Sequence, residues 1–463
     1  MLNTVLNIFR VPELRNKVLF TLLMLAIYRV GFHIPLPGLD QLQFEQAMEN
    51  KGDAGSRLAT YVSIFSGGSL SQSTIFGLGV MPYISASIIF QLLSSVIPAL
   101  EKLKKEGQSG QRKIQEWTRY ATVPIAAMQA AFWLSYIQQQ QLILPGFNTS
   151  FWVLGMLGLV AGTIFLMWLG EQVDEYGLGN GISLLILAGI VSQMPQAVVS
   201  LVSNFSLNIG DAGAINIGDL IALLLCFITV VMGAIAITQA QRKIPIQQAK
   251  HTRGRKVYGG TKQFLPLRVN HGGVMPIIFA QSLMLFPGVL FGYLDPAING
   301  DGEASGVLGV TMRFLNTEFG DYGGFLHVLV MIAMIFFFSY FWTTVQFQPK
   351  EMANQLRDYG SFIPGLRPGR RTAEYLERVM NRITFVGAAF LASIAIIPSV
   401  IGSLLGIDYA VTAFLGGTGL LIVVSVALDM VQRIEANLLM RNYGGFLADD
   451  PKVRNKRIKG RQF

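Results

Sequence analysis

Runs of about 20 apolar residues recur from one end of the chain to the other, with polar segments between them. A helix satisfies its backbone hydrogen bonds internally, which the lipid interior requires of a spanning segment. The pattern therefore predicts an all-α polytopic membrane protein with ten transmembrane helices. The predicted spans are residues 18–36, 74–97, 118–136, 151–170, 180–199, 217–238, 272–293, 325–347, 383–401 and 409–430.

The second span is unlike a plain lipid-facing helix. It is interrupted by Gly77, Gly79 and Pro82, and it follows a short segment of small and apolar residues at 61–71. Glycine and proline at membrane depth need neighbouring protein or water to satisfy the backbone. This stretch fits a cavity-lining helix with a short segment in its mouth. It fits equally well a loop followed by a tightly packed helix, because small residues also mark helix–helix contacts.

Composition supports the membrane class. The chain of 463 residues is 52% hydrophobic and 14% charged, whereas soluble domains carry about 25% charged residues. The first span is long and continues into Pro35 without a small-residue cleavage site, so it is interpreted as a retained span rather than a signal peptide. The single cysteine, Cys226, falls in the sixth span and is expected to be an apolar filler.

Positive charge assigns the two sides of the membrane. All but four of the 36 Lys and Arg residues fall on the side that holds both termini, and the opposite loops hold Lys51, Arg57 and Arg313. Cytoplasmic loops carry such an excess, so both termini are predicted to be cytoplasmic. The short loop at 171–179 is an exception, since its charged residues are acidic.

The tetrapeptide Gly-Val-Met-Pro occurs twice, at 79–82 and 273–276. Each copy lies in the second span of a group of five, and the two spans run in opposite directions. This placement is typical of an inverted repeat, whose functional pathway usually lies between the halves. The predicted halves are residues 1–199 and 217–430, joined by an outside hinge loop at 200–216, and a basic tail follows at 431–463.

Enzymatic signatures are absent from the sequence. It contains no HExxH, paired CxxC, Walker A or nucleophile-elbow motif, so no enzymatic activity and no cofactor are predicted. The four histidines fall in different segments, and no metal site is assigned. Arg29 is the deepest charge, and snorkelling to the outer interface explains it better than a functional role. A carboxylate relay of the kind that ion-coupled pumps use is not visible.

Apolar pairs recur at helical spacing in the candidate pathway helices. Val80 and Ile84 are four residues apart, as are Ile182 and Ile186, so each pair shares one helix face. Ordinary packing is the simpler interpretation of these pairs. A narrow apolar ring that closes a pore to ions is the alternative.

Two cytoplasmic loops are long and basic. The first, at 239–271, alternates residues around a glycine-containing turn and predicts a β-hairpin. The second, at 348–382, contains the run from Gly365 to Arg371. These loops are interpreted as a binding face for nucleic acid or an acidic partner. The basic tail is interpreted as a topology signal attracted to anionic lipids.

Nine short motifs occur along the chain: Arg29–Gly38, Phe65–Gly68, Gly79–Ser87 with Gln91, Lys104–Gly107, Met167–Gln172, Gly179–Ser183, Leu265–Asn270, Gly365–Gly369 and Phe414–Thr418. These motifs resemble those of the bacterial SecY family, the central channels of the general protein translocon. They occur in the family's order and span residues 13–430, whereas the outside loop 294–324 and the tail beyond 442 match no motif.

The resemblance implies a clamshell of two inverted-repeat halves around a central hourglass pore. The segment 61–71 would be the plug, with Ile64, Phe65, Ser66, Gly67 and Gly68 at its centre. The constriction of the pore would be an apolar ring. The residues implied for this ring are Val80, Ile84, Ile182, Ile186, Ile278 and Ile422.

A lateral gate to lipid is implied between spans 2 with 3 and spans 7 with 8. Ser87 and Gln91 would face Gln281 and Ser282 across that seam. The implied function is conduction of unfolded preproteins across the bacterial inner membrane and insertion of membrane proteins, with signal sequences entering at the gate. An ion-coupled secondary transporter built on an inverted repeat is the alternative.

Partners are also implied by the resemblance. The basic loops would dock the SecA ATPase and the ribosome, through Arg253, Arg255, Lys256 and Arg367. SecE would clamp the two halves and SecG would lie alongside, with SecDF and YidC as further candidate partners.

Overall fold

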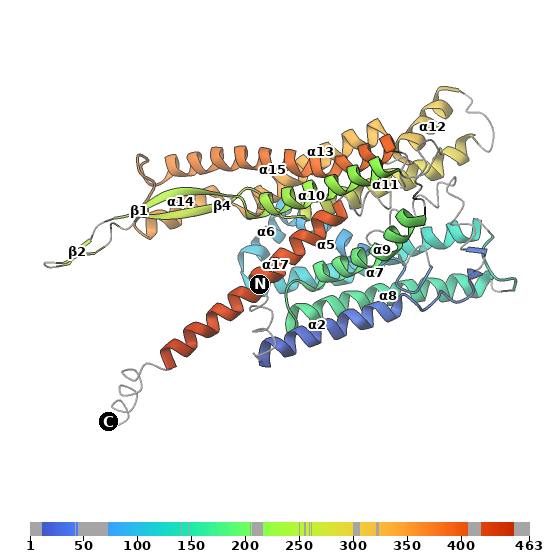
Figure 1. Ribbon diagram of the computed structural model, residues 1–463, viewed down its shortest axis with the longest axis horizontal. Coiled ribbons are helices and arrows are strands. Elements are labelled where there is room, and N and C mark those ends of the chain that lie inside the picture. Colours follow the sequence, from blue (N-terminus) through green and yellow to red (C-terminus); the bar gives the residue numbers. More distant parts are fainter. Residues whose placement is uncertain are drawn as a thin grey trace.

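Long helices make up most of the chain (Figure 1). The computed structural model describes residues 12–41, 43–44, 73–139, 141–146, 148–203, 205, 216–249, 251–253, 256–258, 260, 262–299, 306–320, 324–405 and 418–448. Each of the ten predicted spans has a long helix as its counterpart. These helices are α2 (Pro12–Gly31), α5 (Met81–Val96), α7 (Gln108–Gln139), α8 (Asn148–Tyr176), α9 (Gly181–Ser203), α10 (Ile217–Gln239), α11 (Met275–Asn299), α13 (Phe325–Gln346), α15 (Arg370–Leu405) and α17 (Thr418–Ala448).

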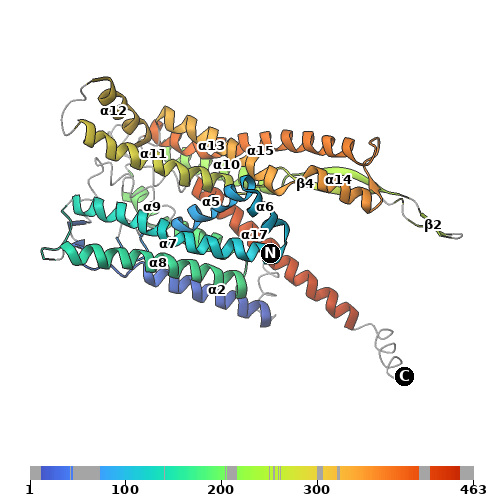
Figure 2. The same ribbon diagram turned by 180° about the vertical axis from the view of Figure 1, so that it is seen from behind.

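Four stretches of the described helices are long and apolar enough to cross a bilayer by themselves: Ser150–Tyr176, Ile217–Gln239, Phe325–Asp358 and Arg370–Ile397. A fifth candidate is the pair formed by α5 and α6 (Pro98–Lys105), which is bent by 103°. Shorter apolar stretches lie in α9 and α11. Figures 1 and 2 show these helices running side by side along the long axis of the molecule.

The second span begins later than its apolar run predicts. Residues 75–80 form turns, and α5 starts only at Met81. Gly79 has a φ of 57°, and Gly273 in the second Gly-Val-Met-Pro copy has a φ of 58°. Glycine adopts this left-handed conformation without steric cost. In both copies the helix begins at the methionine, so the two copies have the same local geometry.

Several segments predicted as loops contain regular structure. Residues 98–117 hold α6 and the first turns of α7, and the outside loop 294–324 holds α12 (Gly306–Gly320). The loop 348–382 holds α14 (Pro349–Asp358) and the start of α15. The last helix, α17, continues past the predicted end of span 10 to Ala448, because helical hydrogen bonding does not require the apolar run to continue.

The two basic loops meet in one sheet. Strands β1 (Gln241–Gln248) and β4 (Lys262–Arg268) pair antiparallel, which confirms the predicted hairpin. The β2 (His251–Arg253) and β3 (Lys256–Tyr258) strands form a smaller pair toward the tip. Strand β5 (Ser361–Phe362) comes from the second loop and pairs with β1, so that the order is β4-β1-β5. The sequence did not predict this junction between the loops.

Apolar side chains gather in several clusters. The largest lies at the centre of the helices and includes residues of α5, α9, α10, α11, α13, α15 and α17. A second joins α7 and α8, and includes Trp133 and Phe151. A third underlies the sheet, where Ile244 and Leu267 pack with Leu376 and Met380 of α15. The basic loops therefore form a small folded unit with its own core.

Candidate functional site

The predicted ring residues meet in the central apolar cluster. Val80, Ile84, Ile186, Ile278 and Ile422 are buried members of that cluster, with exposed fractions of 1–6%. Ile182 is partly buried and packs against it. The residues come from the turn before α5 and from α5, α9, α11 and α17. The structure thus brings together six apolar side chains that are spread over more than 300 residues of sequence.

The backbone has the same geometry in both copies of the repeat, so Ile84 and Ile278 occupy equivalent positions. The Ile84 N–H donates to the Val80 carbonyl at 3.1 Å, and the Ile278 N–H donates to the Val274 carbonyl at 3.1 Å. Each isoleucine therefore lies in the first turn of its helix, five residues after the left-handed glycine. The shared geometry aims both side chains at the same cluster.

A close approach between α8 and α9 positions Ile182 and Ile186. A Cβ atom on Gly181 would overlap the carbonyl oxygen of Gly170, so only glycine fits at the start of α9. The Gly181 N–H donates to Asp174 Oδ1 at 2.7 Å, and the Ser183 N–H donates to Asn180 Oδ1 at 2.9 Å. The Gly-Asn-Gly run at 179–181 is thus a capped helix start.

The predicted gate residues lie on α5 and α11, which contact each other. Gln281 and Ser282 are buried, whereas Ser87 and Gln91 are half-buried. Gln91 Nε2 donates to Ser87 Oγ at 3.4 Å, and Ser282 Oγ donates to the Ile278 carbonyl at 2.8 Å. These bonds stay within their own helices, and Gln91 Oε1 is buried without a hydrogen-bond partner. The described bonds of Ser87 and Ser282 therefore do not tie α5 to α11.

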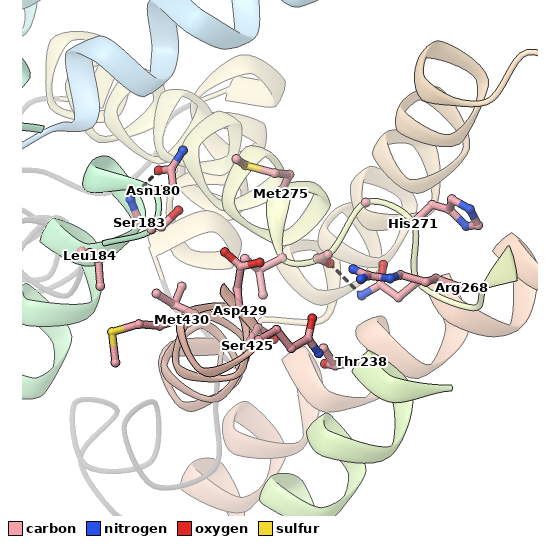
Figure 3. A pocket seen from close by; sticks show the side chains of 17 residues that line it. Asn180, Ser183, Leu184, Thr238, Arg268, His271, Met275, Ser425, Asp429 and Met430 are labelled. Carbon is pink, nitrogen blue, oxygen red and sulfur yellow. Dashed lines mark hydrogen bonds between the residues drawn. The ribbon is translucent and has the colours of Figure 1, made fainter. Parts of the chain in front are cut away.

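A polar cavity of about 200 Å³ opens at the same end of the helices as the sheet. It is lined by the start of α9, the segment between β4 and α11, and one face of α17 (Figure 3). Arg268 and Asp429 give it charges of both signs, and Asn270 Nδ2 donates to the Gly273 carbonyl at 2.8 Å. That bond supports the turn that starts α11. Asn180 and Arg268 fall within the family motifs and Asp429 falls outside them, and the sequence predicted a role for none of the three.

His271 lines the cavity and packs edge-on against Phe347, with ring centroids 5.8 Å apart. Burial lowers the pKa of His271 below its ordinary value, and the nearby positive charge of Arg268 lowers it further. A hydrogen bond with the Arg268 backbone acts in the opposite direction. The neutral imidazole is therefore the form that the folded protein favours at this cavity.

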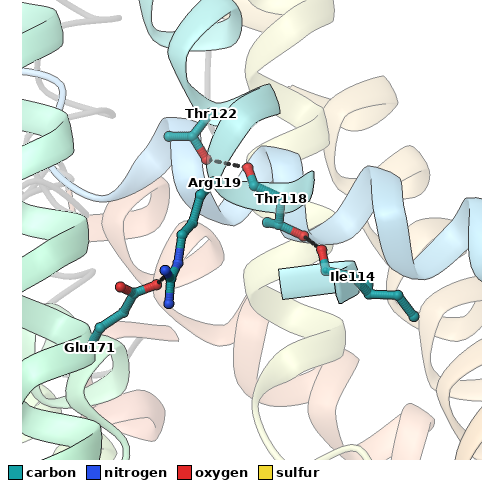
Figure 4. Close-up of polar contacts among 5 residues, drawn as sticks. All are labelled: Ile114, Thr118, Arg119, Thr122 and Glu171. Atoms are coloured by element: carbon teal, nitrogen blue, oxygen red, sulfur yellow. Dashed lines mark hydrogen bonds and ion pairs between the residues drawn. The ribbon is translucent and has the colours of Figure 1, made fainter. Parts of the chain in front are cut away.

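The acidic residues of the loop at 171–179, which departed from the pattern of positive charge, make contacts within the fold. Arg119 of α7 donates to Glu171 of α8 at 2.5 Å (Figure 4). Asp174 accepts the Gly181 N–H bond described above. The hydroxyls of Thr118 and Thr122, which are both buried, donate to the carbonyls one turn earlier, at 2.9 and 2.8 Å, so their polar groups are satisfied within α7. The Glu171 and Asp174 carboxylates thus act in an ion pair and in helix capping.

The predicted docking residues are only partly described. Arg253 and Lys256 lie on β2 and β3, and Arg255 falls outside the described residues. Arg367 is exposed in a turn flanked by Gly365 and Gly369, whose φ values are 86° and 108°. The Thr372 hydroxyl donates to the Arg367 carbonyl at 3.0 Å and holds the turn. The predicted plug, including Ile64, Phe65, Ser66, Gly67 and Gly68, also lies outside the described residues.

Similar proteins identify the family. A family model described as SecY matches residues 74–431. A protein translocase subunit SecY of Thermotoga maritima is 39% identical over 97% of this chain and 99% of its own length. One of Corynebacterium glutamicum is 39% identical over 96% of this chain and all of its own.

Solved structures share the fold at lower identity. A protein-conducting channel structure is 19% identical, with a TM-score of 0.59, over 91% of this chain and 92% of that one. Sec61 from a canine ribosome–channel complex is 21% identical, with a TM-score of 0.54, over the same shares. The predicted all-α polytopic class is therefore confirmed. The chain belongs to the SecY family of protein translocation channels.

Proposed function

We propose that this chain forms a central pore through which unfolded preproteins cross the bacterial inner membrane. The observation that carries the proposal is the convergence of Val80, Ile84, Ile182, Ile186, Ile278 and Ile422 in one apolar cluster. In the proposed resting state this ring closes the pore. A narrow apolar constriction excludes water, and an ion stripped of its hydration there meets a large free-energy barrier.

The proposed lateral gate lies between α5 with α7 and α11 with α13. The residues proposed to face each other there, Ser87 and Gln91 on α5 and Gln281 and Ser282 on α11, are small or polar. Interhelical hydrogen bonds in membranes contribute only about 0.6 kcal/mol on average. Such a seam can part for a signal sequence or a membrane segment. Residues 61–71 would act as a plug behind the ring.

The proposed topology places both termini and the sheet of basic loops in the cytoplasm. In that arrangement residues 1–199 and 217–430 form the two halves, hinged at 200–216. The solved canine relative belongs to a ribosome–channel complex, which supports a ribosome as one partner of the basic loops. SecA is the proposed energy source, with SecE and SecG as companion subunits, and SecDF, YidC and anionic lipids as further partners.

Conductance tests the ring. Replacing Ile84 and Ile278 together by Asn puts two polar amides in the constriction and should hydrate it. The full chain, reconstituted with its companion subunits in planar bilayers, should then conduct ions at rest. Ile84→Val with Ile278→Val keeps the apolar character and should stay closed. Ile137→Asn, in the separate α7–α8 cluster, serves as the control for a buried amide elsewhere.

Two results would contradict the proposal. Resting conductance of the Asn pair that equals the wild type would remove these residues from the barrier. An equal increase with Ile137→Asn would show that any buried amide causes leakage, and the cluster would lose its special role.

A further inference from the structure

Helix α12, in the outside loop, presents an apolar face with nothing described against it. Val307 and Leu308 are 86% and 71% exposed, and Val310 and Phe314 are 57% and 56% exposed. Val307, Val310 and Phe314 are spaced i, i+3 and i+7, so they form one stripe along the 15-residue helix. Large exposed apolar patches mark sites of protein or membrane contact.

The charged side chains of α12 make polar contacts with other parts of the protein. Arg313 lies 3.8 Å from Asp295 of α11, and Asn316 Nδ2 donates to Asp295 Oδ2 at 2.8 Å. Glu318 accepts the Leu326 N–H bond at 3.0 Å and so caps α13. The polar groups of the helix therefore hold it against α11 and α13, while the residues of the stripe remain exposed.

The hydroxyl groups of the two threonines beside the stripe are hydrogen-bonded within α12 and so need no bond to water. Thr311 Oγ1 donates to the Val307 carbonyl at 2.7 Å, and Thr317 Oγ1 donates to the Arg313 carbonyl at 2.9 Å. Both residues are exposed, yet their hydroxyls are satisfied one turn earlier on the same helix. Back-bonding of this kind is how hydroxyl side chains are accommodated where water is scarce.

The apolar surface continues from α12 onto the two spans that it joins. Phe325 and Leu329 of α13 are 77% and 47% exposed, and Leu290 of α11 is 55% exposed. Phe319 of α12 packs on Phe291 with ring centroids 5.4 Å apart. Figures 1 and 2 show α12 beside the ends of α11 and α13 that lie away from β2. These ends are where the proposed topology places the outer membrane–water boundary.

We propose that α12 lies in the outer leaflet of the bilayer, with its Val307–Val310–Phe314 stripe at the boundary between headgroups and acyl chains. Amphipathic helices bind membranes in this way, with the apolar face inserted. Since α11 and α13 form one side of the proposed gate, the helix anchors that side to lipid at its outer end. This inference rests on the proposed topology.

Site-directed spin labelling tests the inference. In a Cys226→Ser background, nitroxides are placed singly at Val310 and Phe314 of the full chain, reconstituted in vesicles of phosphatidylethanolamine and phosphatidylglycerol. Leu225, an exposed residue of α10, is the lipid control, and Arg357, an exposed residue of α14, is the water control. The ratio of oxygen to nickel-chelate accessibility at both test sites should fall between those of the two controls.

Any other outcome contradicts the inference. A ratio equal to that at Arg357 places the stripe in water. Low accessibility to both reagents means that another protein chain covers it. Phe314→Asp should shift a Val310 label toward the Arg357 ratio, whereas Phe314→Leu should not, and equal behaviour of the two variants contradicts lipid contact.

A separate measurement tests the topology on which the inference rests. Asp301→Cys, in the same predicted outside loop but away from the stripe in sequence, should react with a membrane-impermeant maleimide added to the outer face of intact spheroplasts. Labelling only after the inner face is exposed would reject the proposed orientation, whatever the depth of the label.

Discussion

Gly79 and Gly273 show how single residues set the start of a span. Both have left-handed φ angles, and both precede a helix that begins two residues later at methionine. The conformation turns the chain into the helix so that Ile84 and Ile278 reach the same cluster. The repeated tetrapeptide is therefore a conformational signal as well as a sequence repeat.

Gly273→Ala should destabilise the protein by about 1–2 kcal/mol, which is the cost of a left-handed conformation for an L residue. No atom lies within 4 Å of the position that a Cβ would take, so crowding adds nothing. Gly218→Ala, in α10, has the same open surroundings without the left-handed φ and is the matched control. Thermal unfolding in detergent measures both, and equal melting temperatures for the two variants would contradict the assignment.

His271 should make the stability of the protein around the polar cavity sensitive to acid. Its folded pKa is lowered from 6.5, so protonation favours the unfolded state. The stabilisation is complete above the unfolded pKa and is lost as pH falls through the folded pKa. Melting temperatures at pH 7.5 and 5.5 should differ more for the wild type than for His271→Gln. An equal pH dependence would assign the effect to other groups.

The junction of α8 and α9 is the clearest case of one element positioning another. Gly170 and Gly181 allow the two backbones to touch, and Asp174 caps the start of α9. Ile182 and Ile186 follow directly, so the position of the ring depends on this contact.

Gly181→Ala should destabilise the protein by about 1–3 kcal/mol, as overpacking does when a backbone must shift. Gly158→Ala, within α8, meets no atom within 4 Å and should be nearly neutral. Because α9 carries two ring residues, Gly181→Ala should also raise resting ion conductance. A destabilised variant with wild-type conductance would separate this contact from the ring.

Across the whole molecule, β5 joins the two basic loops into one folded unit. Gln247 pairs with Phe362, and the core beneath includes Phe347 and Ile363. Arg367 lies five residues after Phe362, in its glycine-flanked turn, so its backbone is held while its side chain is exposed. The unit is a folded platform at the proposed cytoplasmic end (Figure 1).

Arg367→Glu should slow SecA-driven preprotein import into vesicles more than it weakens ribosome binding. Each phosphate contact that a ribosome makes contributes a log–log salt slope of only about 0.7–0.9, so loss of one leaves the others. Arg357→Glu, on α14 of the same unit, is the matched charge reversal, since Arg357 has an exposed side chain. Import at the wild-type rate with Arg367→Glu would remove this residue from the docking face.

A cross-link between the two proposed halves of the molecule tests the proposed gate. In the Cys226→Ser background, cysteines replacing Ser87 and Ser282 should cross-link under oxidation and block preprotein import, because the seam could no longer part. Reductant should restore import. Efficient import through a fully cross-linked pair would rule out this seam as the exit to lipid.

The sequence by itself determined the membrane class, the ten spans and the family. Lipid imposes one local rule, that each spanning segment must satisfy its own backbone, so an apolar run already specifies a helix. The nine motifs likewise lie within short stretches of chain. The hairpin in the first basic loop was predictable for the same reason, since alternation and a turn are local signals.

Only the tertiary structure decided the contacts between distant parts of the chain. The pairing of β5 with β1, the Arg119–Glu171 bond and the packing of α12 on Asp295 join residues that no local pattern relates. The late start of α5 depends on a left-handed glycine within an otherwise apolar run. Hydrophobic burial has no direction of its own, so the sequence could name the apolar residues of the central cluster, but packing alone decided which of them meet.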